Sequence, residues 1–406
     1  MNHQKMKQTS RIHQKKNKKF FHSSLIKLII IISSSFLYSI EADFSFRSLW
    51  VLHSNLYNES SIDSFIDFAN QNNINNLFVQ VRSRGDALYD SEYVKKNNNI
   101  LNKDFDPLEY IIGKANLNNI KIHIWFNTYI LWSSKTPPVD DNHLFFTKHD
   151  WIESDYHGRT DLDLDLNSIR SPQWEGIYLS PNNPEVNDYL FSLIKEIMDN
   201  YEIDGIHLDY IRFQDDFYGF NKEGKKIFIE EYGFDPKNIY RSFNSNNDTY
   251  SEQWNNYNSK NITSLVERIY SYIDSTNYDV SLSAAVKPNP DEAKSRWKQD
   301  WISWINNDII DFVVPMNYSK DINSFIGNIK SIKENVDQDK MEKIVMGISN
   351  YNQNEYSVTD KLILTKFNNF NQFCIFSYDY KKDEEGWYKV VRNNYNERMR
   401  FIRGYN

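Results

Sequence analysis

The 406-residue sequence predicts an α/β fold, a single (β/α)8 TIM barrel over residues 43–406. From Phe46 onward, short β-branched or aromatic runs alternate with longer amphipathic stretches, and this alternation repeats eight times. No long linker interrupts the series, which argues against two domains. The alternative, an open doubly wound sheet, would need a Gly-rich phosphate turn after its first strand, and the sequence has none there.

The eight expected strands are runs of β-branched and aromatic residues bounded by turn-forming residues. In chain order they are Arg47–Ser54, Asn76–Arg82, Lys121–Asn127, Gly205–Tyr210, Val280–Val286, Phe312–Tyr318, Ile344–Ser349 and Phe373–Tyr378. Helical spacing of apolar residues predicts helices over Ser61–Asn70, Pro107–Leu117, Pro184–Asn200, Ile262–Ser275, Asp291–Ile305, Ile322–Glu334, Asp360–Phe367 and about Glu385–Arg398. Trp297, Trp301 and Trp304 follow the same spacing, so we expect them in the core.

Two connections are several times longer than the ~2 to 6 residues that are typical between a strand and a helix. One runs over residues 128–183, after the third strand, and the other from Ile211 to about Asn261, after the fourth. In a barrel both rise from the C-terminal face, where active sites are built.

Residues 1–42 have the pattern of an export signal or signal anchor with a basic tail. A basic run over residues 15–19 precedes an apolar stretch from about Leu25 to Ile40, and polar sequence follows. Lys27 and three serines make the stretch too short and polar for a typical ~20-residue membrane span. We therefore expect an exported protein, secreted, periplasmic or at the cell surface, with an N-terminal membrane anchor as the alternative.

The charge balance narrows the classes of partner. The formal net charge is −8, but the first 41 residues hold eight Lys and Arg and one acid, which leaves 39 basic and 54 acidic residues, or −15, in the remainder. Such a surface repels phosphate groups, so nucleic acid and anionic membranes are poor partners, and a neutral or cationic ligand fits better. Cys374 is the single cysteine, which excludes an internal disulfide and a Cys-based zinc site.

Polar side chains on the third and fourth strands are the first functional candidates. Alternate residues face the barrel interior, and one face of these strands carries Lys121, His123, Trp125, Asn127, Gly205, His207 and Asp209. Burying a His or Asp side chain costs several kcal/mol unless the side chain is paired with a partner or takes part in function. Asp209, at the C-terminal end of its strand, is therefore the best catalytic candidate, with pairing to Arg212 or Arg82 as the alternative. His207 is equally a substrate contact or a hydrogen-bonded core histidine.

Further candidates lie where other strands end. Arg82 and Asp86 follow the second strand, where a positive group can hold a catalytic carboxylate ionised, or where the two can form an ion pair that fixes the loop. Asn317 and Tyr318 end the sixth strand, and Tyr378 ends the eighth. Each suits contact with ligand hydroxyls or a hydrogen-bonded role at the barrel rim.

The aromatic content points to a class of ligand. Aromatic residues make up 16% of the chain and include 10 Trp, which is high. Flat aromatic faces beside amides and carboxylates suit a carbohydrate cleft, so Trp125, Trp132 and Trp174 are candidates for stacking against sugars. The sequence has no HExxH, calcium loop, His pair at metal spacing, GxSxG turn or P-loop, so no metal or cofactor is expected. Carboxylates among aromatics at a barrel mouth suit acid–base cleavage of a glycosidic bond.

Ordered motifs lie along residues 46–380. They are Arg47–Trp50, Phe78–Arg82, Gly85–Tyr89, Tyr178–Pro181, Pro184–Val186, Asp204–Arg212, Gln299–Trp301 and Asp311–Tyr318. These motifs resemble the glycosyl-hydrolase-like family 10 proteins, a largely bacterial and often exported group with a TIM-barrel domain. The resemblance implies a glycosidase that acts on bacterial glycans, with peptidoglycan strands the favoured substrate, and it implies that Asp209 lies in the active site.

The segment Asp204–Ile211 also resembles the chitinase signature, in which a glutamate follows the last aspartate by two positions. Ile211 occupies that place here, which argues against a substrate-assisted chitinase mechanism. Asp209 is then expected to act as nucleophile or base, with another carboxylate as proton donor. The candidates for the donor, in falling order, are Asp86, Asp300 and Asp379.

The sequence therefore predicts an exported glycoside hydrolase centred on Asp209. The residues expected to orient Asp209 or to contact a sugar substrate are Arg82, Trp125, Asn127, His207, Arg212, Asn317, Tyr318 and Tyr378. Because the chitinase glutamate is missing and the donor is unidentified, a non-catalytic glycan-binding TIM barrel is the first alternative. A barrel lyase or isomerase is the second.

Overall fold

The computed structural model describes residues 39–404, apart from residues 170–173, 240–246, 277 and 382–385. Of the predicted export segment over residues 1–42, residues 1–38 lie outside the described residues. Residues Ile40–Asp43 form a short helix, α2, that packs on the last helix, α14 (Trp387–Ile402). Asp43 forms an ion pair of 3.1 Å with Arg403 and accepts a hydrogen bond of 2.9 Å from Tyr395 Oη. Within the described residues, no helix has both the length and the apolar character that a membrane crossing needs.

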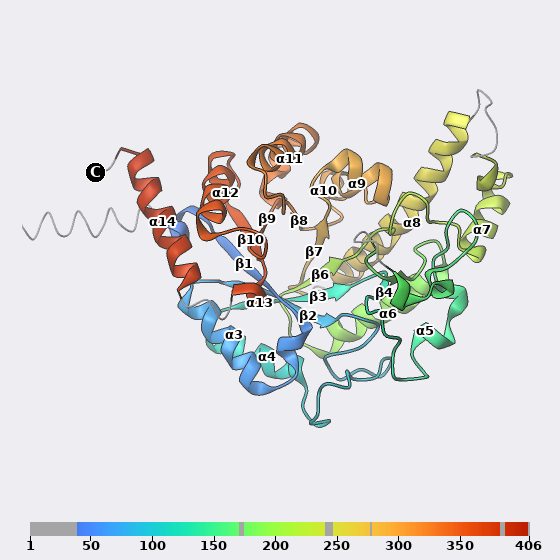
Figure 1. The fold of residues 1–406 in the computed structure, drawn as a ribbon, viewed down its shortest axis with the longest axis horizontal. Coiled ribbons are helices and arrows are strands. Elements are labelled where there is room, and N and C mark those ends of the chain that lie inside the picture. The colour runs from blue at the N-terminus through green and yellow to red at the C-terminus, as the bar shows by residue number, and fades with distance from the viewer. Residues whose placement is uncertain (1–38, 170–173, 240–246, 277, 382–385, 405–406) are drawn as a thin grey trace, which may run out of the picture.

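Eight parallel strands form the barrel, and helices surround it (Figure 1). The strands are β1 (Phe46–Val51), β2 (Asn76–Arg82), β3 (Lys121–Asn127), β6 (Gly205–Asp209), β7 (Ser281–Val286), β8 (Phe312–Pro315), β9 (Met346–Ser349) and β10 (Gln372–Phe376). Their order is β8-β7-β6-β3-β2-β1-β10-β9, and bridges from Val313 to Ile344 and from Met316 to Gly347 join β8 to β9. The predicted (β/α)8 TIM barrel is confirmed.

Most of the surrounding helices begin after a residue whose side chain accepts one of the first free N–H groups of the helix. The surrounding helices are α3 (Glu59–Gln71), α4 (Pro107–Leu117), α6 (Pro184–Asn200), α8 (Asn247–Thr276), α9 (Pro290–Trp297), α10 (Trp301–Asn306), α11 (Ile322–Asn335), α12 (Glu355–Phe367) and α14. An Asn or Asp side chain accepts a backbone hydrogen bond at the start of α3, α4, α6, α9, α11 and α12. Proline stands at the first position of α4, α6 and α9, where its missing N–H costs nothing.

The helix expected over Asp360–Phe367 begins five residues earlier, at Glu355, and two other helices differ more from the sequence prediction. The helix expected over Ile262–Ser275 begins at Asn247, because Trp254 and Tyr257 in its first half pack with Phe220 and Phe228. Asparagine lowers helix propensity in this half, and the aromatic packing outweighs that preference.

The helix expected over Asp291–Ile305 is broken into α9 and α10. Lys298 has a left-handed φ of 58°, and Gln299 leaves the helix to hydrogen-bond the backbone at Ala285 and Lys287. Trp301 and Trp304 are buried as predicted, whereas Trp297 is half-buried beside Lys287.

Long segments follow the third and fourth barrel strands. The first carries β4 (Ile130–Trp132), β5 (Ile177–Tyr178), which pairs antiparallel with β4, and the short helix α5 (Leu144–Thr147); the second carries α7 (Lys222–Tyr232). Glu153 joins the two segments, since its buried carboxylate accepts hydrogen bonds from Gly219 N at 3.2 Å and Asn221 N at 3.1 Å. One further short helix, α13 (Tyr378–Lys381), follows β10.

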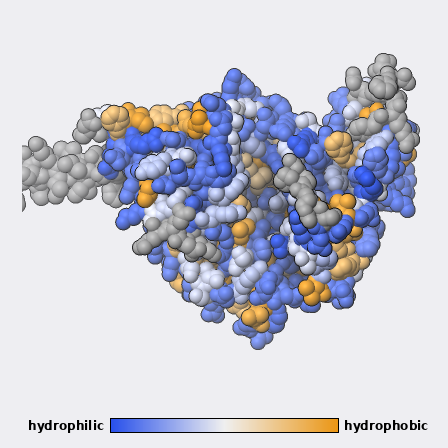
Figure 2. Space-filling view, viewed as in Figure 1, coloured by the Kyte–Doolittle hydropathy of each residue, from blue (hydrophilic) through white to orange (hydrophobic). Residues whose placement is uncertain are grey.

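Aromatic side chains fill the middle of the barrel. The interior cluster contains Trp50, Phe78, Trp125, Phe312, Val314, Val345 and Cys374. Gly205 gives this layer its space, because a Cβ at that position would overlap the imidazole of His123. The face shown in Figure 2 is mostly hydrophilic with scattered apolar patches. The large cluster of buried apolar side chains lies inside the protein.

Candidate active site

A cavity of about 640 Å³ opens at the C-terminal ends of the barrel strands. Its lining combines aromatic rings with charged and amide groups: Trp50, Gln80, Arg84, Trp125, Asn127, Glu175, Asp209, Tyr210, Arg212, Lys287, Tyr318, Tyr351 and Phe376. The volume suits a sugar-sized ligand, and the aromatic and polar mixture suits the apolar faces and hydroxyl rims of sugars.

Asp209 ends β6 at the floor of this cavity and is nearly buried, with 7% of its surface exposed. The chain turns sharply after it, because Tyr210 has a left-handed φ of 52°. One carboxylate oxygen accepts the N–H of Tyr210 at 2.7 Å, and the other accepts the indole N–H of Trp125 at 3.0 Å. Burial raises the pKa of Asp209 to about 6, although these two donors and Arg212 act in the opposite direction.

Glu175 is the second carboxylate in the cavity. It lies just before β5, where the chain passes so close to the carbonyl of Trp132 that a Cβ on Gly176 would overlap that oxygen. Gly176 also has a φ of 151°, which disfavours other residues at this position. The glycine thus allows the long segment after β3 to carry Glu175 over the barrel mouth.

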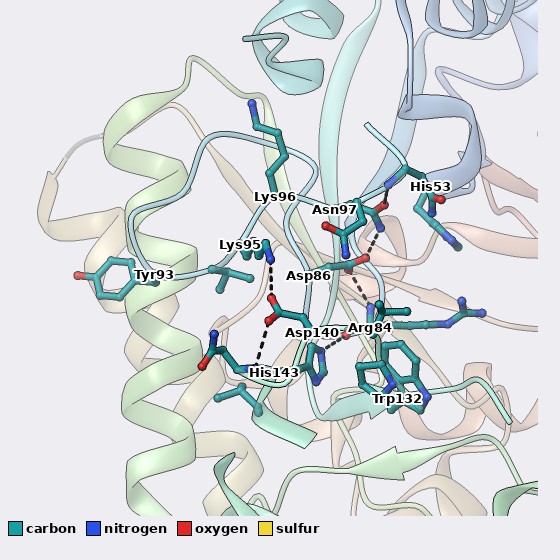
Figure 3. A pocket seen from close by; sticks show the side chains of 18 of the residues that line it. His53, Arg84, Asp86, Tyr93, Lys95, Lys96, Asn97, Trp132, Asp140 and His143 are labelled. Atoms are coloured by element: carbon teal, nitrogen blue, oxygen red, sulfur yellow. Dashed lines mark hydrogen bonds and ion pairs between the residues drawn. The ribbon is translucent and has the colours of Figure 1, made fainter. Parts of the chain in front are cut away.

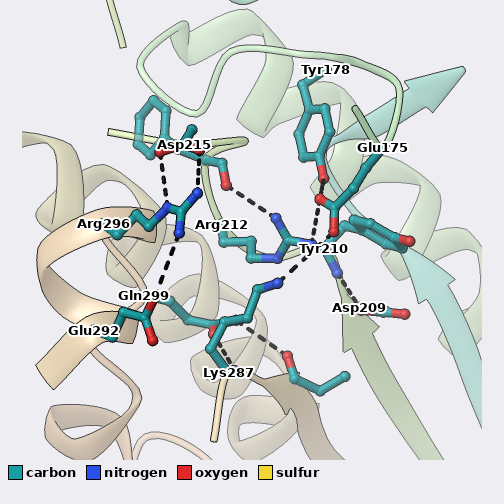
Figure 4. A network of polar contacts seen from close by, with 12 residues as sticks. Glu175, Tyr178, Asp209, Tyr210, Arg212, Asp215, Lys287, Glu292, Arg296 and Gln299 are labelled. Atoms are coloured by element: carbon teal, nitrogen blue, oxygen red, sulfur yellow. Dashed lines mark hydrogen bonds and ion pairs between the residues drawn. The ribbon is translucent and has the colours of Figure 1, made fainter. Parts of the chain in front are cut away.

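Cationic and hydroxyl groups surround Glu175 (Figure 4). Arg212 Nη2 lies 2.8 Å from Oε2, Tyr178 Oη donates to the same oxygen at 2.8 Å, and Lys287 Nζ lies 3.9 Å from Oε1. Burial alone would raise the pKa of Glu175, but the charges of Arg212 and Lys287 outweigh burial and leave it below its ordinary value. Burial and the charge of Arg212 in turn lower the pKa of Lys287 to about 8.

The two carboxyl groups therefore differ in protonation although they share one cavity. Near pH 5, Asp209 is mostly protonated and Glu175 is ionised, since their surroundings move the two pKa values apart. The charge of Glu175 itself contributes to the raised pKa of Asp209. A proton donor beside an ionised carboxylate is the arrangement that acid–base cleavage needs.

Five of the residues predicted from the sequence line the cavity. They are Trp125, Asn127, Asp209, Arg212 and Tyr318. A chain of hydrogen bonds orients Asn127, whose amide donates to Ser83 O at 3.0 Å and accepts from Gln80 Nε2 at 3.4 Å. Tyr318 stacks on Phe376 with their ring centroids 5.5 Å apart.

None of the acids expected as proton donor lines the cavity. Asp86 turns into its own loop, where it accepts the N–H groups of Ser83 and Arg84. Asp300 stands at the start of α10 in an ion pair of 2.7 Å with Lys294. Asp379 accepts the N–H of Leu52 at 3.1 Å and the side chain of Asn55. The structure places Glu175 there instead.

Arg82 lies behind the barrel wall rather than beside Asp209. A bulge shifts the pairing of β2 with β3 so that Gln80 opposes Trp125 and Arg82 opposes Phe126. This extra residue turns Arg82 outward, where its guanidinium lies 5.0 Å from the Phe126 ring and donates to Asn127 O. Arg212, and not Arg82, lines the cavity, and its charge opposes part of the rise in the pKa of Asp209 that burial causes.

His207 lies one layer below the cavity and is fully buried. The indole of Trp50 donates to its Nε2 at 3.3 Å, and Ser283 Oγ lies 2.9 Å from its Nδ1. Because Nε2 accepts, Nδ1 carries the proton and donates to Ser283, so the imidazole is neutral; burial also lowers its pKa well below the ordinary value. The position of His207 supports the alternative of a hydrogen-bonded core histidine. Its hydrogen bond with the indole fixes Trp50, which lines the cavity above it.

The remaining candidates support neighbouring elements. Asn317 bonds Phe325 O and Asn328 on α11, and Tyr378 packs edge-on against Phe68 at 5.2 Å. Trp174 donates to Asp161 at 3.2 Å and does not line the cavity. Trp132 lines a neighbouring pocket.

Sequence reasoning missed Glu175, Lys287 and Trp50 as site residues. Glu175 lies in a segment without strand or helix periodicity, so nothing in the sequence linked it to the barrel mouth. One usable signal was its position beside Gly176, directly before the motif Tyr178–Pro181.

Replacing Asp209 should change the pH dependence of stability. Its pKa is about 6 in the folded state against 3.8 ordinarily, so the folded state binds more protons between those values and the free energy of unfolding falls as pH rises through them. Asp209→Asn removes this penalty. We expect the variant to gain roughly 3 kcal/mol over the wild type between about pH 3.5 and pH 7.5 in urea unfolding. A stability difference that does not change with pH would contradict the burial of an ionisable Asp209.

Comparison with known families and proteins gives consistent matches. A family model described as glycosyl hydrolase-like 10 matches residues 45–363. Glycosyl hydrolase YngK of Bacillus subtilis (strain 168) is 24% identical over 328 residues, which are 72% of this chain and 58% of that protein. Glycosyl hydrolase DigH of Escherichia coli (strain K12) is 29% identical over 149 residues, which are 36% of this chain and 32% of that protein. The chain thus matches less than two thirds of the length of these curated relatives.

Solved structures share the barrel. The PgaB (BpsB) glycoside hydrolase domain from Bordetella bronchiseptica has a TM-score of 0.63 at 10% identity, with 85% of this chain and 98% of that chain covered. Alpha-L-fucosidase isoenzyme 2 from Paenibacillus thiaminolyticus has a TM-score of 0.58 at 14% identity, with 87% and 49% covered. At these identities the likeness establishes the fold and no more.

Proposed function

The chain belongs to the glycosyl hydrolase-like 10 family, and from that membership we propose that it is a glycoside hydrolase of a bacterial glycan. The favoured substrate is the glycan strand of peptidoglycan. The observation that carries the proposal is the pair of carboxyl groups, Asp209 and Glu175, whose pKa values are driven apart in one aromatic-lined cavity.

The raised pKa of Asp209 favours it as proton donor. Its carboxyl proton moves to the glycosidic oxygen while the bond from that oxygen to the anomeric carbon breaks, and the bonding electron pair stays on the departing oxygen. Glu175, which is ionised, faces the electron-poor anomeric carbon. Either it takes a proton from the water that attacks this carbon, or it attacks the carbon itself; in the second case water then breaks the bond between the sugar and Glu175 and gives a proton to Asp209, which is ionised by that point. This assignment reverses the role expected for Asp209 from the sequence and supplies the missing second acid.

The other cavity residues position the sugar and its charges. Trp50, Trp125 and Phe376 offer apolar faces, and Asn127 and Tyr318 offer hydrogen bonds to hydroxyls. Arg212 and Lys287 keep Glu175 ionised, because Arg212 Nη2 lies 2.8 Å and Lys287 Nζ lies 3.9 Å from its carboxylate oxygens. Removing either cation would raise the pKa of Glu175 toward that of Asp209.

The test is release of reducing ends from purified, peptide-free glycan strands, measured across pH. We expect kcat/KM to rise as Glu175 ionises below its ordinary value of 4.5 and to fall about tenfold per pH unit above about 6, where Asp209 loses its proton. Binding to the strands without release of reducing ends at any pH would favour the glycan-binding alternative. Unsaturated or rearranged products would point to a lyase or an isomerase.

We also propose that the protein is exported, with the segment over residues 1–42 as export signal or membrane anchor. The basic run and apolar stretch of that segment support this placement. A glycan-degrading site would then face the compartment that contains the cell wall. Detection of the chain only in the cytosol after cell fractionation would contradict export.

A further inference from the structure

A second pocket of about 570 Å³ adjoins the active-site cavity on the side of β2 and the long segment after β3 (Figure 3). The two spaces share His53 and Arg84 in their walls, so the second, called the side pocket here, continues the first. Its wall combines Tyr57, Tyr93 and Trp132 with asparagine amides and with charged groups of both signs. This lining suits a polar branch of the ligand.

Most charges in the side pocket are already balanced. Asp86 accepts hydrogen bonds from Ser83 N, Arg84 N and the side chain of Asn97. Asp140 forms an ion pair of 3.0 Å with Lys95. Lys96 pairs with Asp90 and donates to two backbone carbonyls. The carboxylates in this wall therefore have their partners.

Arg84 is the exception. No ion pair among the described residues includes it, although it lies where the side pocket meets the active-site cavity. Figure 3 shows its side chain extending away from Asp86 and Asp140, toward the same side as His53. Its guanidinium charge is therefore uncompensated at the junction of the two spaces.

The surroundings hold Arg84 in one orientation. Its Nε donates to Ser133 Oγ at 2.9 Å, its guanidinium lies 5.9 Å from the Trp132 ring, and its carbonyl oxygen lies 2.8 Å from His143 Nε2. None of these contacts gives the two terminal nitrogens of Arg84 a carboxylate partner, and no ion pair in the described part of the chain does so. A fixed, planar pair of N–H donors matches the two oxygens of a carboxylate.

We propose that the side pocket receives a carboxylate-bearing substituent of the substrate and that Arg84 binds its carboxylate. The proposal rests on the proposed function and narrows its substrate class to acidic glycans. The net charge of −15 outside the first 41 residues favours neutral or cationic ligands in general, so an unpaired arginine at the cleft is a local exception. Such an exception selects for an anionic group at one place and not for polyanions over the whole surface.

The test compares two forms of one ligand. Peptide-free strands of alternating N-acetylglucosamine and N-acetylmuramic acid carry a carboxylate on every second sugar, and conversion to the methylamide removes that charge. We expect the wild type to favour the acidic form in kcat/KM, and Arg84→Gln to lower the acidic-to-neutral ratio about 10- to 100-fold. Arg84→Lys should restore part of the ratio, since it keeps the charge but not the planar pair of donors.

Lys95→Gln is the matched control, because it removes one positive charge from the same pocket at a residue already paired with Asp140. It should change the ratio less than about twofold. An equal fall of the acidic-to-neutral ratio in Lys95→Gln and Arg84→Gln would mean that the total positive charge of the pocket, and not Arg84, selects the acidic form. That result would overturn the proposal. A wild type that does not distinguish the two forms would also overturn it, while the proposed hydrolysis would stand.

Calorimetric binding of both forms to Asp209→Asn tests the inference without hydrolysis. A wild type that cleaves neither form would contradict the proposed function. A preference for the acidic form that is lost in Asp209→Asn/Arg84→Gln would still support Arg84 as the carboxylate-binding residue. The absence of such a preference would refute it.

Discussion

Asp209→Asn is expected to lower kcat for cleavage of purified glycan strands by about a thousandfold. The carboxamide fills the same space and can still accept the hydrogen bonds from Tyr210 or Trp125, but it has no proton to give to the glycosidic oxygen. General acid catalysis contributes about 10²- to 10⁴-fold in rate, so a loss of this size is the expected effect. KM should change little, because the side chain keeps its shape. Release of reducing ends measures both constants.

Asp300→Asn is the matched control for this substitution. Asp300 was among the acids that the sequence offered as donor, but it lies outside the cavity in an ion pair with Lys294. We expect its replacement to change kcat less than about twofold. Equal release by the wild type and Asp209→Asn would remove Asp209 from catalysis, and a large loss in Asp300→Asn would place the donor elsewhere.

Glu175→Gln is expected to lower kcat by about 10²- to 10⁴-fold. The substitution removes the negative charge that faces the anomeric carbon, and the neutral amide can neither attack that carbon nor accept a proton from water. The alkaline fall of kcat/KM should also move to lower pH, since the charge of Glu175 contributes to the raised pKa of Asp209. The pH dependence of the residual activity measures this displacement.

The same change leaves Arg212 without its ionised partner, although Arg212 is only 2% exposed. We expect Glu175→Gln to lower the free energy of unfolding by roughly 1–3 kcal/mol, because a buried charge then lacks compensation. Urea unfolding separates this effect from loss of activity. Azide added to Glu175→Ala gives a second readout, since rescue with formation of a glycosyl azide would identify an attacking carboxylate. A variant that is folded and fully active would exclude Glu175 from the chemistry.

The barrel and its central acid were predictable because both depend on local pattern. Runs such as Asn76–Arg82 and Lys121–Asn127 have the composition of buried parallel strands, and the structure has strands with the same bounds. The alternation along Gly205–Asp209 placed Asp209 at the interior C-terminal end of its strand, and it lies there. The alternation of residues along one strand is enough to predict which side chains face the barrel interior.

The rest of the site depends on contacts that periodicity does not encode. The bulge between Gln80 and Arg82 turns the Arg82 side chain from the barrel interior to the outer side of the strand. The hydrophobic pattern of the sequence does not reveal a shift of a single residue. Glu175 reaches the cavity through an irregular segment that Gly176 allows to pass over β4. Gln299 breaks a regular helical pattern because its amide is needed at the ends of β6 and β7.

The division of roles between Asp209 and Glu175 is tested most directly with a leaving group that needs no proton. The substrate is the 2,4-dinitrophenyl glycoside of the sugar found at the new reducing end of the cleaved strands. Asp209→Asn should lose less than about tenfold in kcat/KM on this glycoside while it loses about a thousandfold in kcat/KM on the strands, and Glu175→Gln should lose activity on both. An Asp209→Asn variant that loses as much on the aryl glycoside as on the strands would contradict Asp209 as the proton donor.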